Sequence, residues 1–191
     1  MQIEKEIEFK NLLTKQEFEL LVSFFQVDQK DFRSQTNYYF DTQDNFFKDN
    51  GMGFRLRVLR DQNELTLKQP IEKHVMEENT VHVSDQERDA IINQTAFPSI
   101  PFLEQFNLLS PLKCIGILQT NRVQIPFKSG TLFLDHSIYS QIEDFEIEYE
   151  SSDVKYGEKV FNDLLVSHNI PIRHTDKKIA RLVKYNNKLK G

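Results

Sequence analysis

Charged and apolar side chains alternate with a period of two in several segments of the chain. In "EKEIEFK", residues 4–10, three glutamates and Lys10 share one face, whereas Ile7 and Phe9 share the other. Successive side chains of a β-strand point to opposite faces, so this pattern predicts a strand with one charged and one apolar face. Four later segments repeat the pattern: "GFRLRVL", "ELTLK", "TNRVQIP" and "IEDFEIEYE".

Together with other segments of strand-like composition, these patterns predict about nine strands joined mostly by short connections. The predicted strands span residues 4–10, 35–41, 53–60, 64–68, 71–78, 113–120, 121–126, 131–135 and 142–150. Hairpin turns are expected at "RDQN", residues 60–63, and at "FKSG", residues 127–130. Many neighbouring antiparallel strands with a few helices favour an α+β protein built on a curled sheet or a barrel.

Helices are predicted in four other segments. Two begin at capping boxes, in which a hydroxyl and a carboxylate satisfy free backbone amides: Thr14 with Glu17, and Ser84 with Glu87. A third helix is expected over residues 153–168, where apolar residues follow helical spacing. The last, "TDKKIARLVKYN", residues 175–186, is short and basic on one side.

The polar faces of the strands carry mostly ionised residues and few of the serines, threonines and asparagines of a generic wet face. Taken singly, each strand fits a sheet with one wet face. The charges are nonetheless sorted by strand, because the first and last strands are mainly acidic and the middle ones mainly basic. If the sheet closes, acids and bases face each other across a lumen. That lumen has to hold water and ions, because dry burial costs several kcal/mol per ion.

Such a lumen indicates which ligands it binds. Four or more converging cationic side chains favour a multiply charged anion. Two converging Glu-x-Glu pairs favour hard divalent cations such as Mg²⁺ or Mn²⁺, which take carboxylate oxygens. A polyphosphate or a nucleoside triphosphate is an anion that requires both the cationic side chains and the divalent cations.

The composition narrows the class of protein. The 191 residues are expected to form one domain, residues 1–191, and the net charge of −5 argues against a general nucleic-acid coat protein. Cys114 is the single cysteine, which excludes a disulfide framework and a thiolate metal cluster. Neither a signal peptide nor an apolar run of membrane-spanning length is found, so the expected location is the cytoplasm, with no membrane partner.

The motifs as an ordered set match a known family. "EIEFK", residues 6–10, has the Glu-x-Glu-x-Lys form of the CYTH domains, also called triphosphate tunnel metalloenzymes. Glu-x-Glu-x-Lys alone is a weak signal, but "FRLR", "LTLK", "TNR", "LFLD", "EIE" and "KKIAR" follow in the expected order over almost the whole chain. The chain most resembles the small stand-alone CYTH proteins of Gram-positive bacteria, and is less like thiamine triphosphatase or the class IV adenylate cyclases.

The resemblance implies a closed eight-stranded antiparallel β-barrel, forming a tunnel, with helices packed outside. It also implies metal-dependent hydrolysis of triphosphate-containing substrates in the tunnel, with Mg²⁺ or Mn²⁺. The implied metal ligands are Glu6, Glu8, Glu146, Glu148 and Asp135, although the direction of the Asp135 side chain is open. The implied phosphate-binding residues are Lys10, Arg55, Arg57, Lys68, Arg122 and, from the terminal helix, Lys178 or Arg181.

Two departures from the family pattern leave the substrate open. "LKQPIEKHVMEE", residues 67–78, contains Glu77 and Glu78 as competing acidic positions, and "TNRVQ" offers a single basic residue, Arg122. The attacking water is activated either by a second metal ion or by Lys10 with Tyr39 nearby. Tyr39 also fits a structural role.

Two alternative functions would use the same charged residues of the lumen. A class IV-type adenylate cyclase needs an adenine pocket, for which no aromatic or amide cluster stands out. A non-catalytic polyphosphate or nucleotide sensor would tolerate loss of the four glutamates, and their presence favours an enzyme. Inorganic triphosphate, a nucleoside triphosphate, thiamine triphosphate and an RNA 5′ end all fit the tunnel. The basic terminal helix fits a plug at the end of the tunnel better than a nucleic-acid-binding patch. The sequence does not determine the oligomeric state.

Overall fold

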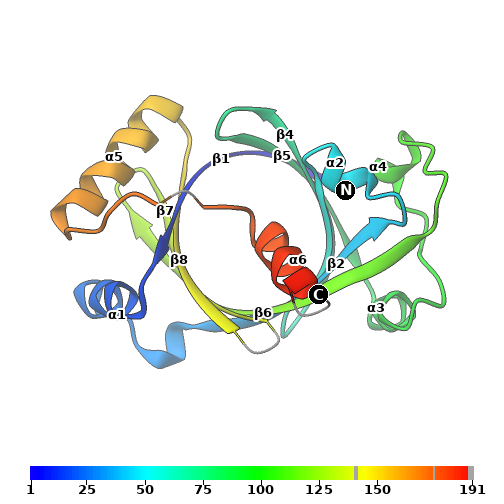
Figure 1. Cartoon of the computed structure of the whole chain (residues 1–191), viewed down its shortest axis with the longest axis horizontal. Coiled ribbons are helices and arrows are strands. Elements are labelled where there is room, and N and C mark those ends of the chain that lie inside the picture. The colour runs from blue at the N-terminus through cyan, green and yellow to red at the C-terminus, as the bar shows by residue number, and fades with distance from the viewer. Residues whose placement is uncertain (140–141, 174, 189–191) are drawn as a thin grey trace.

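Eight antiparallel strands close into a barrel (Figure 1). The computed structural model describes residues 1–139, 142–173 and 175–188. The strands are β1 (Gln2–Leu13), β2 (Arg33–Thr42), β3 (Gly53–Val58), β4 (Asn63–Glu72), β5 (Val75–Val83), β6 (Leu112–Phe127), β7 (Gly130–Tyr139) and β8 (Ile142–Ser151). The predicted fold class, an α+β protein built on a closed eight-stranded antiparallel barrel, is confirmed.

Closure of the barrel depends on β1, which pairs with β5 on one side and with β8 on the other. The order around the ring is β1-β5-β4-β3-β2-β6-β7-β8. A closed ring leaves no strand edge with unpaired backbone groups. It also places the acidic first and last strands side by side, with the basic strands β3 and β4 elsewhere on the ring.

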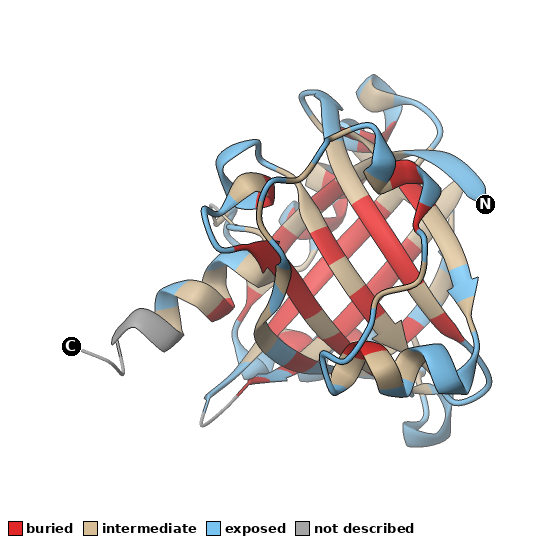
Figure 2. Ribbon diagram, turned by 90° about the vertical axis from the view of Figure 1, so that its right-hand side faces the viewer, coloured by how far each residue is buried: buried red, intermediate tan, exposed pale blue. Residues whose placement is uncertain are grey.

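The helices cover the outside of the barrel and one of its ends. They are α1 (Lys15–Phe24), α2 (Phe46–Asp49), α3 (Asp85–Ile92), α4 (Pro101–Glu104), α5 (Val154–Ser167) and α6 (Lys178–Lys188), with a 3₁₀ turn at Gln29–Asp31. Both predicted capping boxes are present, at the starts of α1 and α3. α1 and α5 pack against β1 and β8, whereas α6 lies at one end of the barrel, opposite the N-terminus (Figure 2). In the described part of the chain, no helix has the length and apolar character to cross a membrane.

The hydrophobic core lies between the barrel and its helices. One cluster joins Phe9 and Ile147 of the strands to Leu21 of α1 and Phe161 of α5. A second cluster joins the outer faces of β2, β3 and β4 to α2, α3 and α4. The apolar side of each alternating strand therefore faces the helices, and the charged side faces the lumen.

β6 corrects the prediction of nine strands. The segments predicted as two strands, residues 113–120 and 121–126, form one strand of 16 residues. Its first part pairs with β2 as far as Arg122, and its second part pairs with β7 from Gln119 onward. Hydrogen bonding to these two neighbours continues across Thr120 and Asn121, so the chain does not turn there.

The hairpin between β4 and β5 corrects a second prediction. The strand predicted over residues 71–78 is wrong at its start, because β4 continues to Glu72 and β5 begins at Val75. The intervening turn contains His74 with φ 64°, a left-handed conformation that only a minority of non-glycine residues adopt. The turn carries no glycine or asparagine, so the usual sequence signal of a tight hairpin is missing.

An apolar cluster seats α6 in the mouth of the barrel. Leu182 of α6 packs with Tyr39, Leu118 and Tyr139 of the strands. Gly116 of β6 leaves the necessary space, because a Cβ at that position would lie 2.4 Å from Leu182 Cδ2. The terminal helix is therefore an integral part of the tunnel end, in agreement with a plug.

Candidate active site

The lumen contains a cavity of about 410 Å³ at the α6 end, lined by side chains from all eight strands and from the start of α6. Ten residues predicted for the site line it: Glu6, Glu8, Lys10, Tyr39, Arg55, Arg57, Lys68, Arg122, Glu148 and Lys178. The other three, Asp135, Glu146 and Arg181, are joined to this group by ion pairs. The fold thus brings the predicted residues together.

Four glutamates form one wall of the cavity, where β1 pairs with β8. They are Glu6, Glu8, Glu148 and Glu150. Glu8 lies directly opposite Glu150 in the strand register. Burial opposes ionisation of Glu8, but the ammonium groups of Lys10 and Lys68 lower its pKa to about 2. At Glu150, burial and the negative charge of Glu6 raise the pKa to about 7. The wall therefore holds mutually repelling carboxylates, which attract cations.

Cationic side chains from β3 and β4 reach across to the acidic residues. Lys68 Nζ lies 2.5 Å from Glu6 Oε2 and 2.7 Å from Glu8 Oε2. It also lies 3.3 Å from Glu78 Oε1, and Arg55 Nη2 lies 3.7 Å from the same oxygen. Acids and bases from different strands thus meet inside the lumen, as the sorting of charges by strand predicts.

Arg57 differs from the other arginines of the cavity. Within residues 1–139, 142–173 and 175–188, no carboxylate oxygen lies within 4.0 Å of it, and its Nε donates to Asn37 Oδ1 at 3.1 Å. Burial, followed by the charges of Arg55 and Arg122, lowers the pKa of Arg57 to about 10. The guanidinium is still charged at neutral pH. Arg57 is half-buried, and a cation in a cavity without a nearby counter-charge is a binding group for an anion.

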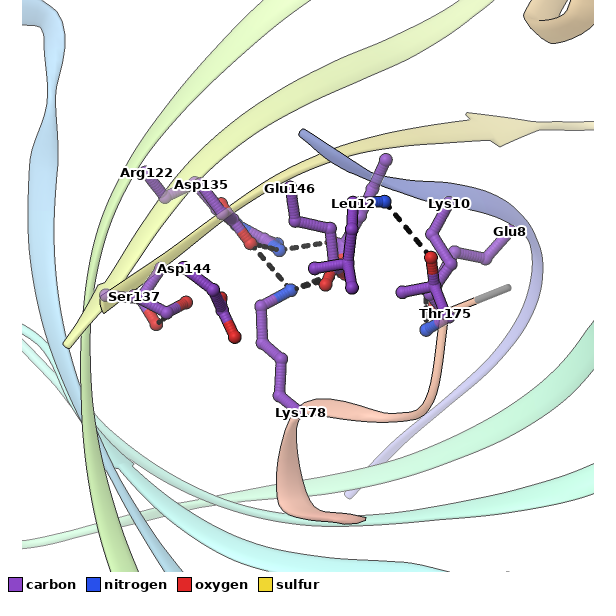
Figure 3. Close-up of polar contacts among 12 residues, drawn as sticks. Glu8, Lys10, Leu12, Arg122, Asp135, Ser137, Asp144, Glu146, Thr175 and Lys178 are labelled. Atoms are coloured by element: carbon purple, nitrogen blue, oxygen red, sulfur yellow. Dashed lines mark hydrogen bonds and ion pairs between the residues drawn. The ribbon is translucent and has the colours of Figure 1, made fainter. Parts of the chain in front are cut away.

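Lys178, the first residue of α6, inserts among three buried carboxylates (Figure 3). Its Nζ lies 2.9 Å from Asp135 Oδ2, and 2.9 Å from Glu146 Oε1. It lies 2.5 Å from Glu148 Oε1. Burial raises the pKa of Glu146 to about 7, although Lys178 opposes this shift. Arg122 holds both oxygens of Asp135 at 2.7 Å, so the Asp135 side chain, whose direction was open, points toward the lumen.

Arg181, one turn further along α6, holds the helix to the rim of the barrel. Its Nε lies 2.9 Å from Asp144 Oδ2, and its Nη2 lies 2.5 Å from Glu146 Oε2. The hydroxyl of Tyr139 donates to the same aspartate. Of the two alternatives for a phosphate contact from the terminal helix, Lys178 lines the cavity, whereas Arg181 is engaged outside its lining.

Lys10 and Tyr39, predicted to activate water, come from opposite sides of the ring. Lys10 Nζ lies 2.5 Å from Glu8 Oε1. Tyr39 lies opposite Arg55 in the register of β2 and β3, and its ring packs in the cluster that seats Leu182. The packing suits the structural role of Tyr39, and the catalytic role of both residues stays a prediction.

The structure adds three charged residues to the cavity that the sequence interpretation did not assign: Glu78, Glu150 and Lys177. Of the two competing acidic positions, Glu78 lines the cavity, whereas Glu77 lies on the opposite face of β5. Glu150 continues the period-two pattern of β8, so the alternation alone could have identified it. Lys177 precedes α6 and has no periodic signal.

The acidic wall has the donor chemistry of a site for a hard divalent cation. Among the described residues, no three His, Cys, Asp or Glu side chains are already arranged around one metal position. Lysines take the carboxylate oxygens instead, since Lys10 pairs with Oε1 of Glu8 and Lys68 with Oε2. Oxygen donors on one wall suit Mg²⁺ or Mn²⁺, so the residues fit such an ion once the lysines move to another partner.

The raised pKa of Glu150 predicts a pH dependence of stability. Its folded-state pKa of about 7 exceeds the ordinary 4.5 of a glutamate, so between these values the folded state binds the proton more tightly. The contribution of Glu150 to stability is therefore full below about pH 4.5 and is lost as pH rises through about 7. We expect the melting temperature in metal-free buffer to fall between about pH 5 and pH 8. Glu150→Gln should reduce this fall.

The control is Glu19→Gln, because Glu19 is exposed on α1. Glu146 has the same raised pKa, so Glu150→Gln should remove only part of the dependence. Carboxylates with a lowered pKa, such as Glu8, act below this window. A wild-type melting temperature that rises between about pH 5 and pH 8 would contradict the prediction.

A closed barrel whose lumen sets glutamates against arginines defines a tunnel protein for polyanions and divalent cations. The CYTH domain model matches residues 4–183, and the chain belongs to the CYTH domain family. "Putative triphosphatase YjbK" of Bacillus subtilis (strain 168) is 37% identical to it over 187 residues, which cover 95% of each protein. The resemblance predicted from the ordered motifs is confirmed.

Solved structures share the whole architecture. A Bacillus halodurans protein described as a "putative adenylate cyclase" is 35% identical, with a TM-score of 0.89 over 95% of this chain and 98% of that chain. HpAC1 from Hippeastrum, described as a "putative adenylyl cyclase" with a dominant triphosphatase activity, has a TM-score of 0.78 at 19% identity. That likeness covers 97% of this chain and 96% of HpAC1, and it concerns the fold.

Proposed function

We propose that this chain is a divalent-metal-dependent triphosphatase that binds triphosphate-containing substrates inside the barrel. Arg57 carries the proposal: it is a half-buried guanidinium with no carboxylate within 4.0 Å in the described residues, in a cavity it shares with Arg55 and Arg122. The Bacillus subtilis relative, whose name describes a triphosphatase, supports the reaction class. Inorganic triphosphate and nucleoside or other organic triphosphates are the candidate substrates.

The carboxylates of the acidic wall would hold the divalent cation, Mg²⁺ or Mn²⁺. The proposed ligands are Glu6, Glu8 and Glu148, with Glu150 added because it faces Glu8 across the strand pair. Asp135 and Glu146, also predicted as ligands, are paired with Lys178 and lie outside the cavity lining, which includes Glu148, so their place among the ligands stays a prediction. Such a cation, when bound, neutralises phosphate oxygens and lowers the pKa of a water molecule that it carries.

The cationic side chains would bind the oxygens of the triphosphate. The proposed set is Arg55, Arg57, Lys68, Arg122 and Lys178, with Lys10 beside Glu8. In the free protein Lys10 and Lys68 hold Glu8, and a substrate offers both lysines phosphate oxygens in its place. Donors that are already positioned stabilise the charge that develops on the leaving phosphate without further reorganisation.

We also propose that residues 1–191 form one domain. β1 near the N-terminus closes the barrel with β8, and α6 near the C-terminus packs into its mouth. The first and last described elements therefore belong to one structural unit.

Phosphate release tests the proposed function. The wild-type protein should release orthophosphate from tripolyphosphate or ATP with Mg²⁺ or Mn²⁺, and EDTA should abolish the release. Glu8→Gln should lower the rate by about 100-fold, because it removes a charged ligand from the acidic wall. Glu19→Gln on the exposed face of α1 is the control and should act like the wild type.

The products separate triphosphatase chemistry from its alternatives. Pyrophosphate and a cyclic nucleotide from ATP would identify a cyclase instead. Binding of tripolyphosphate without turnover, unchanged in Glu8→Gln, would identify a sensor.

A further inference from the structure

We propose that Asn37 is a positioning residue for the triphosphate: its neutral amide orients Arg57 and leaves that guanidinium without a counter-charge, available to a phosphoryl group. This inference rests on the proposed function. It assigns a role in substrate binding to β2, whose cavity-lining residues are uncharged.

The register of the barrel places the two side chains together. Asn37 of β2 lies directly opposite Arg57 of β3, and both side chains line the cavity. Arg57 Nε donates to Asn37 Oδ1 at 3.1 Å, and Asn37 is only 2% exposed. A single bond at Nε leaves the two terminal nitrogens of the guanidinium, which form the fork that matches a phosphate, free of this contact.

The other arginines of the cavity are compensated by acids. Arg55 has Glu78 at 3.7 Å, and Arg122 has Asp135 at 2.7 Å. On β2 the residue opposite Arg57 is the amide Asn37. On β4 it is Glu64, whose carboxylate accepts from Gln62 and, among the described residues, does not come within 4.0 Å of the guanidinium. An aspartate at position 37 would have nearly the same shape, so the neutral side chain is the chemical difference that keeps Arg57 uncompensated.

The β2 residues that line the cavity beside the basic strand β3 are uncharged. Gln35, Asn37 and Tyr39 line the cavity in succession. An amide accepts a hydrogen bond from Arg57 without neutralising it, and its own nitrogen is a further donor for a phosphate oxygen. Asn37 of β2 therefore orients Arg57, and the positive charge of Arg57 remains available for the substrate.

Asn37→Asp tests this inference because it should move stability and substrate affinity in opposite directions. The carboxylate would pair with Arg57 and relieve a half-buried charge that has no ion-pair partner in the described residues, so the melting temperature without ligand should rise by about 2–4 °C. The same pairing competes with the phosphoryl group, so KM for tripolyphosphate with Mg²⁺ should rise about tenfold or more. A merely structural asparagine would give a lower melting temperature.

The control is Asn121→Asp, which adds the same charge on the outer face of β6, next to the inward-facing Arg122. It should leave KM within about twofold of the wild type. A fall in melting temperature for Asn37→Asp would overturn the inference, as would an unchanged KM in an active protein. If the wild type hydrolyses no triphosphate, the proposed function fails. The role of Asn37 in substrate binding then fails as well, even if Asn37→Asp raises the melting temperature.

Discussion

Arg57→Ala is expected to lower kcat/KM for the triphosphate substrate by about 10²–10³-fold, the usual effect of removing one preorganised donor to a developing charge. Arg57 lacks a carboxylate partner in the described residues, so its charge is available to the substrate. The substitution should not unfold the protein. It removes a half-buried cation whose pKa is already lowered to about 10 by desolvation and by the neighbouring arginines. Steady-state kinetics and thermal melting measure the two effects.

Two further variants make this result specific. Arg57→Lys keeps the charge but loses the planar fork, so its activity should lie between those of the wild type and Arg57→Ala. Arg60→Ala is the matched control, because the Arg60 side chain lies a few residues further on and is 86% exposed. Activity of Arg57→Ala within about twofold of Arg60→Ala would show that Arg57 binds no part of the substrate, contrary to the role proposed for it.

Lys178→Met is expected to lower the free energy of unfolding by about 3–5 kcal/mol, the usual cost of removing one partner from a buried ion pair. Lys178 lies within 2.9 Å of Asp135, Glu146 and Glu148, and the first two of these are fully buried. Arg122 and Arg181 remain, but they do not replace a charge at the centre of three carboxylates. Urea denaturation at about pH 8, where Glu146 is ionised, measures the loss.

Lys177→Met is the matched control for this experiment. Lys177 is the preceding residue, and in the described residues no carboxylate lies within 4.0 Å of it. Its Nζ donates to the carbonyl oxygen of Gly51 at 2.7 Å, a single bond to a neutral acceptor worth about 1.5 kcal/mol. Equal losses of stability in the two variants would mean that the three carboxylates do not depend on Lys178. We also expect Lys178→Met to lower the free energy of unfolding by less at lower pH, because Glu146 then takes up a proton.

The sequence by itself determined the fold class and most of the tunnel wall. Once Ile7 and Phe9 are assigned to the core, the period of two places Glu6, Glu8 and Lys10 on the other face. The same reasoning oriented the arginines of β3. This succeeds because an apolar face must be buried, and in a closed barrel covered by helices the opposite face has only the lumen.

Only the tertiary structure decided which acid meets which base. Lys68 and Glu8 are 60 residues apart, and their ion pair at 2.7 Å exists because the ring closes between β1 and β5. The sequence left Lys178 and Arg181 as alternatives for a phosphate contact. Of the two, Lys178 lines the cavity, at the depth at which Leu182 seats α6. The sequence interpretation also divided β6 into two strands at Asn121. Local sequence signals do not show that β2 and β7 both remain hydrogen-bonded to the chain at this point.

The same limit explains Asn37. No periodic pattern in the sequence marks Asn37 as a site residue. The role proposed for it depends on the strand register, which sets it opposite Arg57. A periodic pattern records which face a side chain occupies. The partner across the barrel depends on register, closure and helix depth, and these follow from contacts between residues distant in sequence.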